Sequence, residues 1–268
     1  MIENNSQKNI VISIITSVLN SDETIERTIE SVINQSYSAI EYIIIDGGST
    51  DKTMEIINKY KSSIAYIESE PDKGLYSAMN KGASRAKGDY LYFLNADDWL
   101  WNDHVIESIS PILMVKSPGI MFGNTRMIYP DYTVTKSRKF NHNNLSRGKI
   151  PPHQGSFIKK EIFLGYDGFD ETFKYAADLD LFCRLKDKSV NILEIDKTIA
   201  NVTAGGISSR KNRSYPEVLD VIKRHYGKLS AKLFWLKKIV IEQGLKKLLK
   251  RTGLESIYIY LTRVINKE

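Results

Sequence analysis

The chain has 268 residues, of which 42% are apolar and 26% are charged, and its formal net charge is +6. These proportions are typical of globular proteins, and a chain of this length buries a sizeable core without needing disulfide bonds or structural metals. The single cysteine, Cys183, excludes an internal disulfide framework and a zinc site built from cysteines. We find no apolar run long enough to span a bilayer and no signal-peptide pattern at the N-terminus. The sequence therefore predicts a soluble, cytoplasmic protein.

The positive charge is concentrated at the C-terminal end. From Arg210 to Glu268 there are 15 basic and 5 acidic residues, whereas residues 1–209 hold 23 basic and 27 acidic ones. A mildly acidic body with a basic tail favours an anionic partner, either a membrane surface or a nucleic acid.

Strand-like and helix-like patterns alternate over the first hundred residues. Short apolar, β-branched runs predict strands, and apolar residues at helical spacing predict the helices between them. The predicted strands are 10–16, 40–45, 64–68 and 89–94, and the predicted helices follow residues 20–22, 46–51 and 71–74. Residues 121–155 mix short strand-like pieces with polar turns, and 175–185 reads as a further helix. The alternation predicts an α/β fold with a mostly parallel central sheet flanked by helices.

Carboxylates follow three of these predicted strands. They are Asp46, Asp72 and the adjacent pair Asp97-Asp98. Because ligands of open α/β sheets bind beyond the carboxyl ends of the strands, we expect these side chains at one edge. Adjacent aspartates repel each other unless a cation joins them, and such oxygen ligands suit Mg²⁺ or Mn²⁺ shared with substrate phosphates. The alternative is that Asp98 caps a helix near residues 99–102 while Asp97 is solvated.

Residues 46–51 (DGGSTD) form a predicted turn between a strand and a helix. Its two glycines let the backbone approach a ligand closely. The alternative is a tight turn in which Ser49 or Thr50 caps the following helix. The segment is neither a P-loop nor a dinucleotide-binding fingerprint, because the required spacings are missing.

Two aspartates lie two positions apart on the predicted helix 175–185. Asp178 and Asp180 should point about 200° apart, so only one of them can face a given cleft. Arg184 stands four residues after Asp180, which predicts a surface ion pair on that side. Asp178 is then the unpaired candidate for a general base, the alternative being a solvated or capping aspartate.

Several short motifs, taken together, resemble a known family. In order they are TSVLN at 16–20, IDGGSTD at 45–51, SEPDKGLYSAMNKG at 69–82, FLNADD at 93–98, His153-Gln154, GFDE at 168–171 and AADLDL at 176–181. Each motif alone is weak, but the ordered set resembles the inverting family-2 glycosyltransferases of bacterial surface-polysaccharide and O-antigen biosynthesis. The resemblance covers about residues 8–210.

The resemblance implies the GT-A fold, a nucleotide-sugar donor and a divalent metal, Mn²⁺ or Mg²⁺. By the family pattern, Asp97 and Asp98 match the metal motif and Asp178 matches the catalytic base. His153 and the loop 205–208 approach the diphosphate or the acceptor. The residues that the motifs assign to the donor are Thr16, Asn20, Asp46, Gly48, Ser49, Asp72, Lys73, Gly74, Asn80, Asn95, Ala96, Asp97 and His153.

Three positions depart from the commoner family pattern. Gly47 replaces an aspartate that often reads the uracil edge, Asn95 replaces the first aspartate of the metal motif, and Ala177 replaces a glutamate before the base. The Gln-x-x-Arg-Trp motif of processive members is missing from the sequence. The resemblance therefore implies an enzyme that adds one sugar per encounter.

We expect an inverting, metal-dependent glycosyltransferase that moves one hexose or N-acetylhexosamine from a nucleotide sugar, with UDP as the expected nucleotide. The expected acceptor is a saccharide linked to a polyprenyl diphosphate. The alternatives are a sugar-1-phosphate nucleotidyltransferase, whose glycine-rich phosphate loop is not visible, and a non-catalytic nucleotide-sugar or glycan-binding module. Binding of nucleic acid through the tail is disfavoured because no recognition motif accompanies the charge.

The expected organisation is a catalytic domain at 1–210 and a basic amphipathic tail at 211–268. Within the domain, residues 8–100 would bind the nucleotide sugar and 101–210 the acceptor. The tail interleaves lysines with apolar residues, and an apolar stripe runs from Leu254 to Ile265. It predicts peripheral attachment to the anionic inner face of the plasma membrane, the alternative being helices that pack on the domain.

Overall fold

The computed structural model describes residues 9–137, 140–186, 190–205 and 211–236. The predicted stripe from Leu254 to Ile265 and most of the loop 205–208 lie outside these residues. The strands are β1 (Ile12–Val18), β2 (Ile40–Asp46), β3 (Tyr66–Ser69), β4 (Tyr90–Phe93), β5 (Trp99–Leu100), β6 (Ile120–Ile128), β7 (Thr133–Lys136), β8 (Ser156–Lys159) and β9 (Ile192–Thr203). The α-helices are α1 (Ile25–Ile33), α2 (Thr53–Lys59), α3 (Leu75–Arg85), α4 (Val105–Lys116), α5 (Lys160–Gly165), α6 (Ala177–Leu185) and α7 (Lys211–Trp235). Short 3-10 helices cover Lys61–Ser63, His142–Arg147 and His153–Gly155.

One sheet runs through the molecule in the order β3-β2-β1-β4-β8-β6-β9-β5, with β7 paired to β6. Its first half, β3-β2-β1-β4, is parallel throughout, as the alternating pattern predicts. The second half is mixed, because β8 runs antiparallel to both β4 and β6 while β9 runs parallel to β6. The predicted α/β fold with helices flanking a central sheet is confirmed.

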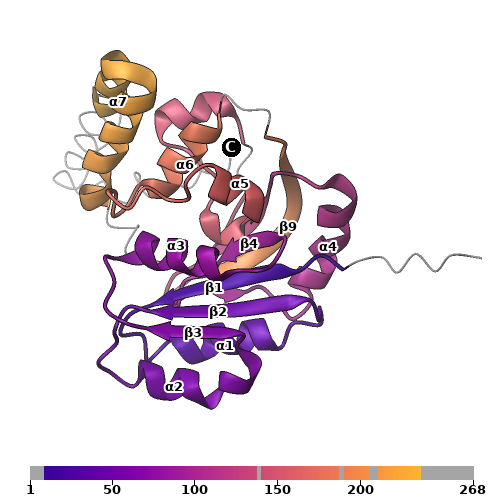
Figure 1. Ribbon diagram of the computed structural model, residues 1–268. Helices are drawn as coiled ribbons and strands as arrows, with labels where there is room; N and C mark the ends of the chain where they lie inside the picture. Colours follow the sequence, from indigo (N-terminus) through magenta and orange to yellow (C-terminus); the bar gives the residue numbers. More distant parts are fainter. Residues whose placement is uncertain (1–8, 138–139, 187–189, 206–210, 237–268) are drawn as a thin grey trace, which may run out of the picture.

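Helices cover both faces of the parallel half (Figure 1). Successive residues of a strand point to opposite faces, so Ile12 and Ile14 of β1 pack with α1 and α4, whereas Ile15 packs with α3 and α6. Helix α3 comes close to β1 at Gly82, where an added Cβ would lie 2.4 Å from the Ile15 side chain. The apolar clusters on the two faces of the sheet hold each strand in place along its axis, and this sets the position of the loop that follows it.

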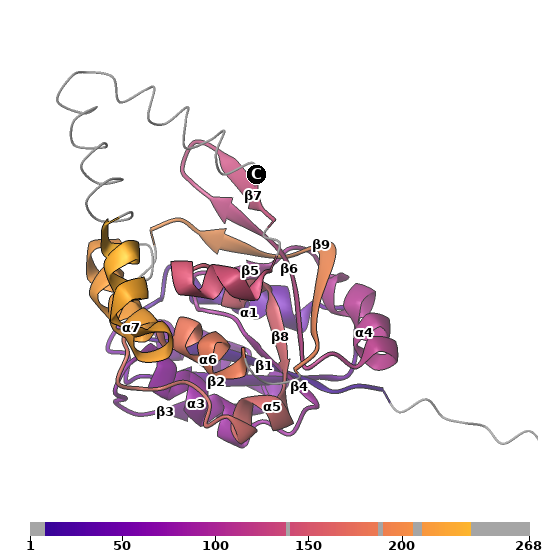
Figure 2. The same cartoon turned by 90° about the horizontal axis from the view of Figure 1, so that it is seen from above.

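The helix α7 lies beside α6 (Figures 1 and 2). Its first part buries Val221 and Ile222, and the helix kinks at Gly227, where φ is 84°. Beyond the kink, Ala231 and Phe234 join Ile222 in a small cluster of their own. Residues after position 210 thus contact the predicted catalytic domain. The expected boundary between that domain and the tail at residues 210–211 stays a prediction.

In the part of the chain that the structure describes, no helix combines the length and the hydropathy needed to cross a membrane.

Candidate active site

The first group of polar residues lies at the carboxyl end of β2. Asp46 is fully buried, and its carboxylate accepts hydrogen bonds from the backbone N–H groups of Gly48 (3.1 Å) and Ser49 (3.0 Å). The hydroxyls of Ser49 and Ser69 donate to it as well, at 2.5 and 2.6 Å. Asp46 thus organises the turn with its own oxygens instead of offering them to a ligand.

The alternative in which Ser49 or Thr50 caps the next helix is wrong. Helix α2 begins only at Thr53, and the side chain that accepts its first backbone N–H is that of Asp51, at 2.9 Å. Ser49 bonds Asp46, and the backbone N–H of Thr50 donates to Asn20 Oδ1 at 2.9 Å. Ser49 and Thr50 therefore tie the turn to Asp46 and to the loop after β1 rather than to α2.

Asp72 approaches this turn from the loop after β3. Its Oδ1 accepts a hydrogen bond from the backbone N–H of Gly74 at 2.8 Å. Its Oδ2 lies 3.0 Å from the place that a Cβ on Gly47 would take. The carboxylate of Asp72 thus fills the space beside Gly47, and neighbouring Lys73 is exposed.

The second group lies beyond β4. Asp98 is almost completely buried, accepting the backbone N–H of Thr203 (3.0 Å) at Oδ1 and the amide groups of Gln154 (3.1 Å) and Asn95 (3.3 Å) at Oδ2. Residues 99–100 form strand β5, and the next helix begins at Val105, so the alternative of Asp98 as a helix cap is wrong. Both oxygens of Asp98 are used inside the protein.

Asp97 is less buried than Asp98, and its backbone carbonyl, rather than its carboxylate, accepts the hydrogen bonds from neighbouring side chains. Its carbonyl accepts from Thr203 Oγ1 at 2.5 Å and from Arg27 Nη2 at 3.2 Å. Within the described residues, no side chain donates a hydrogen bond to the carboxylate of Asp97. Burial raises the pKa of Asp97, which the charges of His153 and Arg27 partly offset.

The two carboxylates share a poorly solvated place. Burial, and then the neighbouring charge of Asp97, raise the pKa of Asp98 to about 7. Asn95 adds a further polar group, because its Oδ1 is buried and finds no hydrogen-bond partner among the described residues. The negative charge of Asp97 is only partly balanced by its neighbours, and the amide oxygen of Asn95 lies at the same edge of the sheet. A bound cation would stabilise both groups.

His153 joins this edge to α6. Its Nε2 lies 3.3 Å from Asn95 Nδ2, and its Nδ1 lies 3.8 Å from Asp178 Oδ2. The side chain of Asp178 is 21% exposed and remains reachable from solvent. Helix α6 begins at Ala177, two residues later than predicted, which places Asp178 in its first turn.

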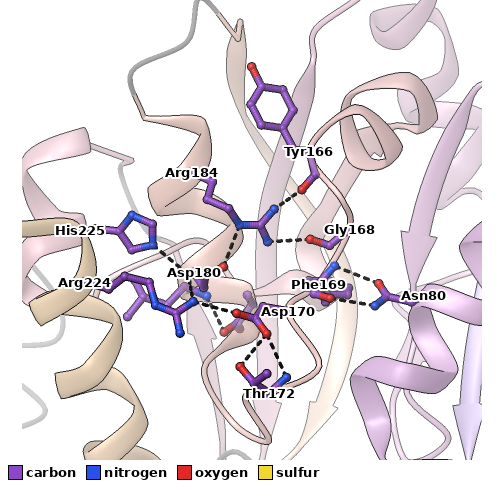
Figure 3. A network of polar contacts seen from close by, with 12 residues as sticks. Asn80, Tyr166, Gly168, Phe169, Asp170, Thr172, Asp180, Arg184, Arg224 and His225 are labelled. Atoms are coloured by element: carbon purple, nitrogen blue, oxygen red, sulfur yellow. Dashed lines mark hydrogen bonds and ion pairs between the residues drawn. The ribbon is translucent and has the colours of Figure 1, made fainter.

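Asp180 does not form the surface ion pair that the helical spacing predicts. It is 1% exposed, and it accepts Arg184 Nε at 2.7 Å while contacting His225 Nε2 at 2.8 Å (Figure 3). The pairing with Arg184 at i+4 is present, but it is buried because α7 covers this side of α6. Asp178 is therefore the accessible aspartate of the two.

Three further predicted donor residues are engaged inside the protein. Thr16 is buried and shares a hydrogen bond with the Tyr42 hydroxyl at 3.2 Å. Asn80 Nδ2 donates to the carbonyl of Phe169 at 2.8 Å, and Asn80 Oδ1 accepts the backbone N–H of the same residue at 2.9 Å. Ala96 is buried, and its carbonyl accepts from Thr28 Oγ1 at 2.9 Å.

The family follows from comparison with known proteins. The sequence model of Glycosyl transferase family 2 matches residues 13–173, more than half of the chain. The chain belongs to this family. An uncharacterized glycosyltransferase of Mycobacterium tuberculosis is 35% identical over 178 residues, which cover 65% of this chain and 68% of that protein. The chondroitin synthase of Pasteurella multocida is 31% identical over 183 residues, which cover 66% of this chain but 19% of that protein.

Solved structures agree at the level of the fold. TarS of S. aureus in complex with UDP has a TM-score of 0.64 at 18% identity, covering 81% of this chain and 65% of that one. The mannosyltransferase PcManGT of Pyrobaculum calidifontis, in complex with GDP-Man and Mn²⁺, has a TM-score of 0.62 at 15% identity, covering 97% and 84%. The expected GT-A fold is confirmed. Family membership makes the protein a glycosyltransferase and sets aside the nucleotidyltransferase and the non-catalytic module.

The site of this glycosyltransferase also contains residues to which the sequence assigned no role. Gln154 and Thr203 hold Asp98, and Arg27 lies 3.5 Å over the Trp99 ring beside Asp97. Of these residues, Gln154 could have been assigned to the site from the sequence, because it stands next to His153 in the same motif. Thr203 lies 105 residues from Asp98 in the sequence, and no local pattern links them.

Proposed function

We propose that this glycosyltransferase inverts the anomeric centre as it moves one hexose or N-acetylhexosamine from a nucleotide sugar, with UDP as the nucleotide, to a saccharide acceptor. The observation that carries the proposal is the position of His153, which contacts Asn95 of the metal motif on one side and Asp178 on the other. A donor held at the first and an acceptor deprotonated at the second would meet there. The neighbours that bind UDP and GDP-Man support a nucleotide-sugar donor.

The residues beyond β4 fit a divalent cation. Among the residues that the structure describes, no side chain donates a hydrogen bond to the carboxylate of Asp97, and Asn95 Oδ1 has no hydrogen-bond partner, so both can offer oxygen ligands. We infer that these two residues hold the metal and that Asp98, with both oxygens in use, anchors the loop; this revises the expectation of Asp98 as a ligand. The described residues contain no cluster of three or more His, Cys, Asp or Glu that could hold a metal alone. Phosphate oxygens of the donor would complete the coordination, as is common for Mg²⁺.

When bound, the metal would neutralise the charge that grows on the departing diphosphate. The protein's own residues do the rest. Asp178 Oδ2 accepts the proton of the acceptor hydroxyl as that oxygen attacks the anomeric carbon. Asp178 Oδ1 accepts the backbone N–H of Leu179 at 2.7 Å, which orients the carboxylate, and His153 Nδ1 lies 3.8 Å from Oδ2. A single displacement from the face opposite the leaving group inverts the configuration.

The nucleoside would lie over the turn after β2. Asp72 Oδ2 faces the space beside Gly47, and Lys73 and Gly74 follow it at the start of α3. Gly48 needs its glycine, since φ is 86° and a Cβ would lie 3.2 Å from Pro71. Asp46 and Ser49 shape this pocket from beneath, so their contribution to donor binding is indirect.

We also propose a lipid-linked acceptor and peripheral attachment to the inner face of the plasma membrane, for a role in surface-polysaccharide synthesis. Support comes from the stretch beyond the kink of α7, which exposes apolar side chains next to Lys228 and Lys232. These are Leu229, Leu233 and Trp235 of α7 and Leu236 just after it. Apolar side chains flanked by lysines are the composition of helices that lie in an anionic membrane interface.

The activity is tested by a donor screen. Purified protein is incubated with UDP- and GDP-sugars and a synthetic diphosphate-lipid saccharide, with Mn²⁺, Mg²⁺ or EDTA, and the anomeric product is assigned by NMR. We expect transfer with inversion that EDTA abolishes. Asp97→Asn should lose it, whereas Asp131→Asn, an exposed aspartate between β6 and β7, should keep it. Full activity in EDTA, or retention of configuration, would refute the mechanism.

Attachment is tested by sedimentation with vesicles. We expect binding to vesicles rich in phosphatidylglycerol, weaker in high salt, and little binding to neutral vesicles. A Leu229→Gln and Leu233→Gln double variant should bind less without unfolding, because both leucines are exposed. Truncation before Leu229 is a poorer test, since it removes the packed Ala231 and Phe234. Equal binding to neutral and anionic vesicles would contradict the electrostatic attachment.

A further inference from the structure

The helix α7 holds the beginning of α6 through Glu217. The carboxylate of Glu217 accepts hydrogen bonds from three consecutive backbone N–H groups, those of Lys174 (3.0 Å), Tyr175 (2.7 Å) and Ala176 (3.1 Å). Within α6 itself, Asp178 Oδ1 accepts the backbone N–H of Leu179 at 2.7 Å, whereas the carboxylate of Glu217 serves the residues just before the helix. A carboxylate at a helix N-terminus also faces the positive end of the helix dipole. Glu217 thus fixes the point at which the chain enters α6, from 41 residues further along the sequence.

A second contact fixes α6 one turn later. His225, eight residues after Glu217 and on the same side of α7, meets the buried Asp180 at 2.8 Å. Asp180 also accepts from Arg184, whose other nitrogens donate to the carbonyls of Tyr166 and Gly168 (Figure 3). The inner side of α6 is therefore tied both to α7 and to the loop after α5.

A third contact closes the arrangement around that loop. Arg224 donates to Asp170 at 2.8 Å, and Asp170 accepts the backbone and hydroxyl of Thr172 (Figure 3). Arg224 also lies over the Phe173 ring, 4.7 Å from its centroid. The segment 170–176 that leads into α6 is consequently held by α7 at both ends.

Asp178 stands between the two points that α7 fixes on α6. Ala176 lies two residues before it and Asp180 two residues after it, so its backbone has little freedom to move. Its carboxylate reaches out of this clamped turn toward His153. Shifts of about 1 Å in a reacting group cost up to about 10²-fold in rate, so such a clamp matters for chemistry as well as for stability.

We propose that Glu217 and Asp180 are positioning residues, through which α7 holds Asp178 in place for proton transfer. The inference rests on the proposed function, because it takes Asp178 as the general base. It makes the first part of α7 a component of the catalytic unit, whatever the remainder of the basic tail does.

The test uses the full chain with three substitutions on α7. Glu217→Ala removes the acceptor of the three N–H groups, Glu217→Gln keeps one acceptor oxygen, and Asp220→Ala removes an exposed carboxylate from the same helix as a control. Hydrogen exchange of the backbone amides at 174–180 is measured beside kcat and donor KM. We expect Glu217→Ala to speed exchange at these amides and to lower kcat about tenfold with donor KM unchanged. Glu217→Gln should recover most of the kcat, and Asp220→Ala should match the wild type.

The outcomes separate the clamp from the proposed activity. Faster exchange in Glu217→Ala with an unchanged kcat would show a purely structural clamp and overturn the positioning role. A kcat loss in Asp220→Ala equal to that in Glu217→Ala would overturn it too. Absence of sugar transfer by the wild-type enzyme would refute the proposed function, while the exchange data would still report whether Glu217 orders residues 174–176.

Discussion

The two sides of the site are held in place in different ways. On the proposed donor side, Asp46 is satisfied largely by its own turn, through backbone groups two and three residues away. On the proposed acceptor side, α6 is held by Glu217 and His225, which lie more than 40 residues along the chain. A self-contained turn leaves a recognisable motif in the sequence, whereas a clamp built from distant elements leaves none. The predictions below test this difference.

The largest effect is expected at Asp178. Asp178→Asn keeps the shape of the side chain but removes its basicity, so we expect kcat to fall at least ~10²-fold. Donor KM should stay within a factor of two, because the proposed donor site lies on the other side of His153. Steady-state kinetics at saturating acceptor measure both parameters, with Asp220→Asn as the control. A loss smaller than about tenfold would show that the acceptor side relies on another base.

Asp180→Asn should act first on stability. Arg184 and His225 would lose a charged partner in a buried place, so the free energy of unfolding should drop by about 2 kcal/mol. Urea denaturation at pH 7 measures it. Asp178→Asn, at a partly exposed position, should stay within about 0.5 kcal/mol of the wild type. If the two variants are equally stable, Asp180 does not anchor α6 as its contacts indicate.

On the donor side, Gly47→Asp places a second carboxylate against Asp72 Oδ2, which lies 3.0 Å from the new Cβ. Repulsion should push Asp72 out of the pocket, so we expect donor KM to rise about tenfold while kcat changes little. Gly165→Asp is the matched control, because an added Cβ there has no neighbour within 4 Å. An unchanged donor KM in Gly47→Asp would remove Asp72 from the proposed donor pocket.

The smallest effect concerns Cys183, on the clamped helix. Burial raises the pKa of its thiol to about 12, so the reactive thiolate is scarce at pH 8. We expect iodoacetamide to modify native protein slowly at pH 8 and urea-unfolded protein rapidly, with mass spectrometry as the readout. Native modification as fast as that in urea would mean that α6 opens readily and is not locked by α7.

Much of the parallel half could be predicted because its signals are local. Short apolar runs defined β1, β2 and β4 to within two residues, and the carboxylates after them were expected at one edge. The same local reasoning treated Asp97 and Asp98 alike, although both carboxylate oxygens of Asp98 are occupied by hydrogen bonds. It could not show that Gln154 and Thr203 occupy both oxygens of Asp98, since burial depends on elements that arrive later in the chain.

By itself, the sequence determined the α/β alternation and the ordered motifs, and it pointed to Asp178 rather than Asp180 as the aspartate left free to face a cleft. Those features depend on periodicity and on residues that are neighbours along the chain. Only the tertiary structure decided that Asp180 is buried, that Asp46 serves its own turn, and that α7 holds the helix carrying Asp178. Each of these depends on which distant side chain removes a polar group from water, and that is fixed when the two halves of the sheet and α7 pack together.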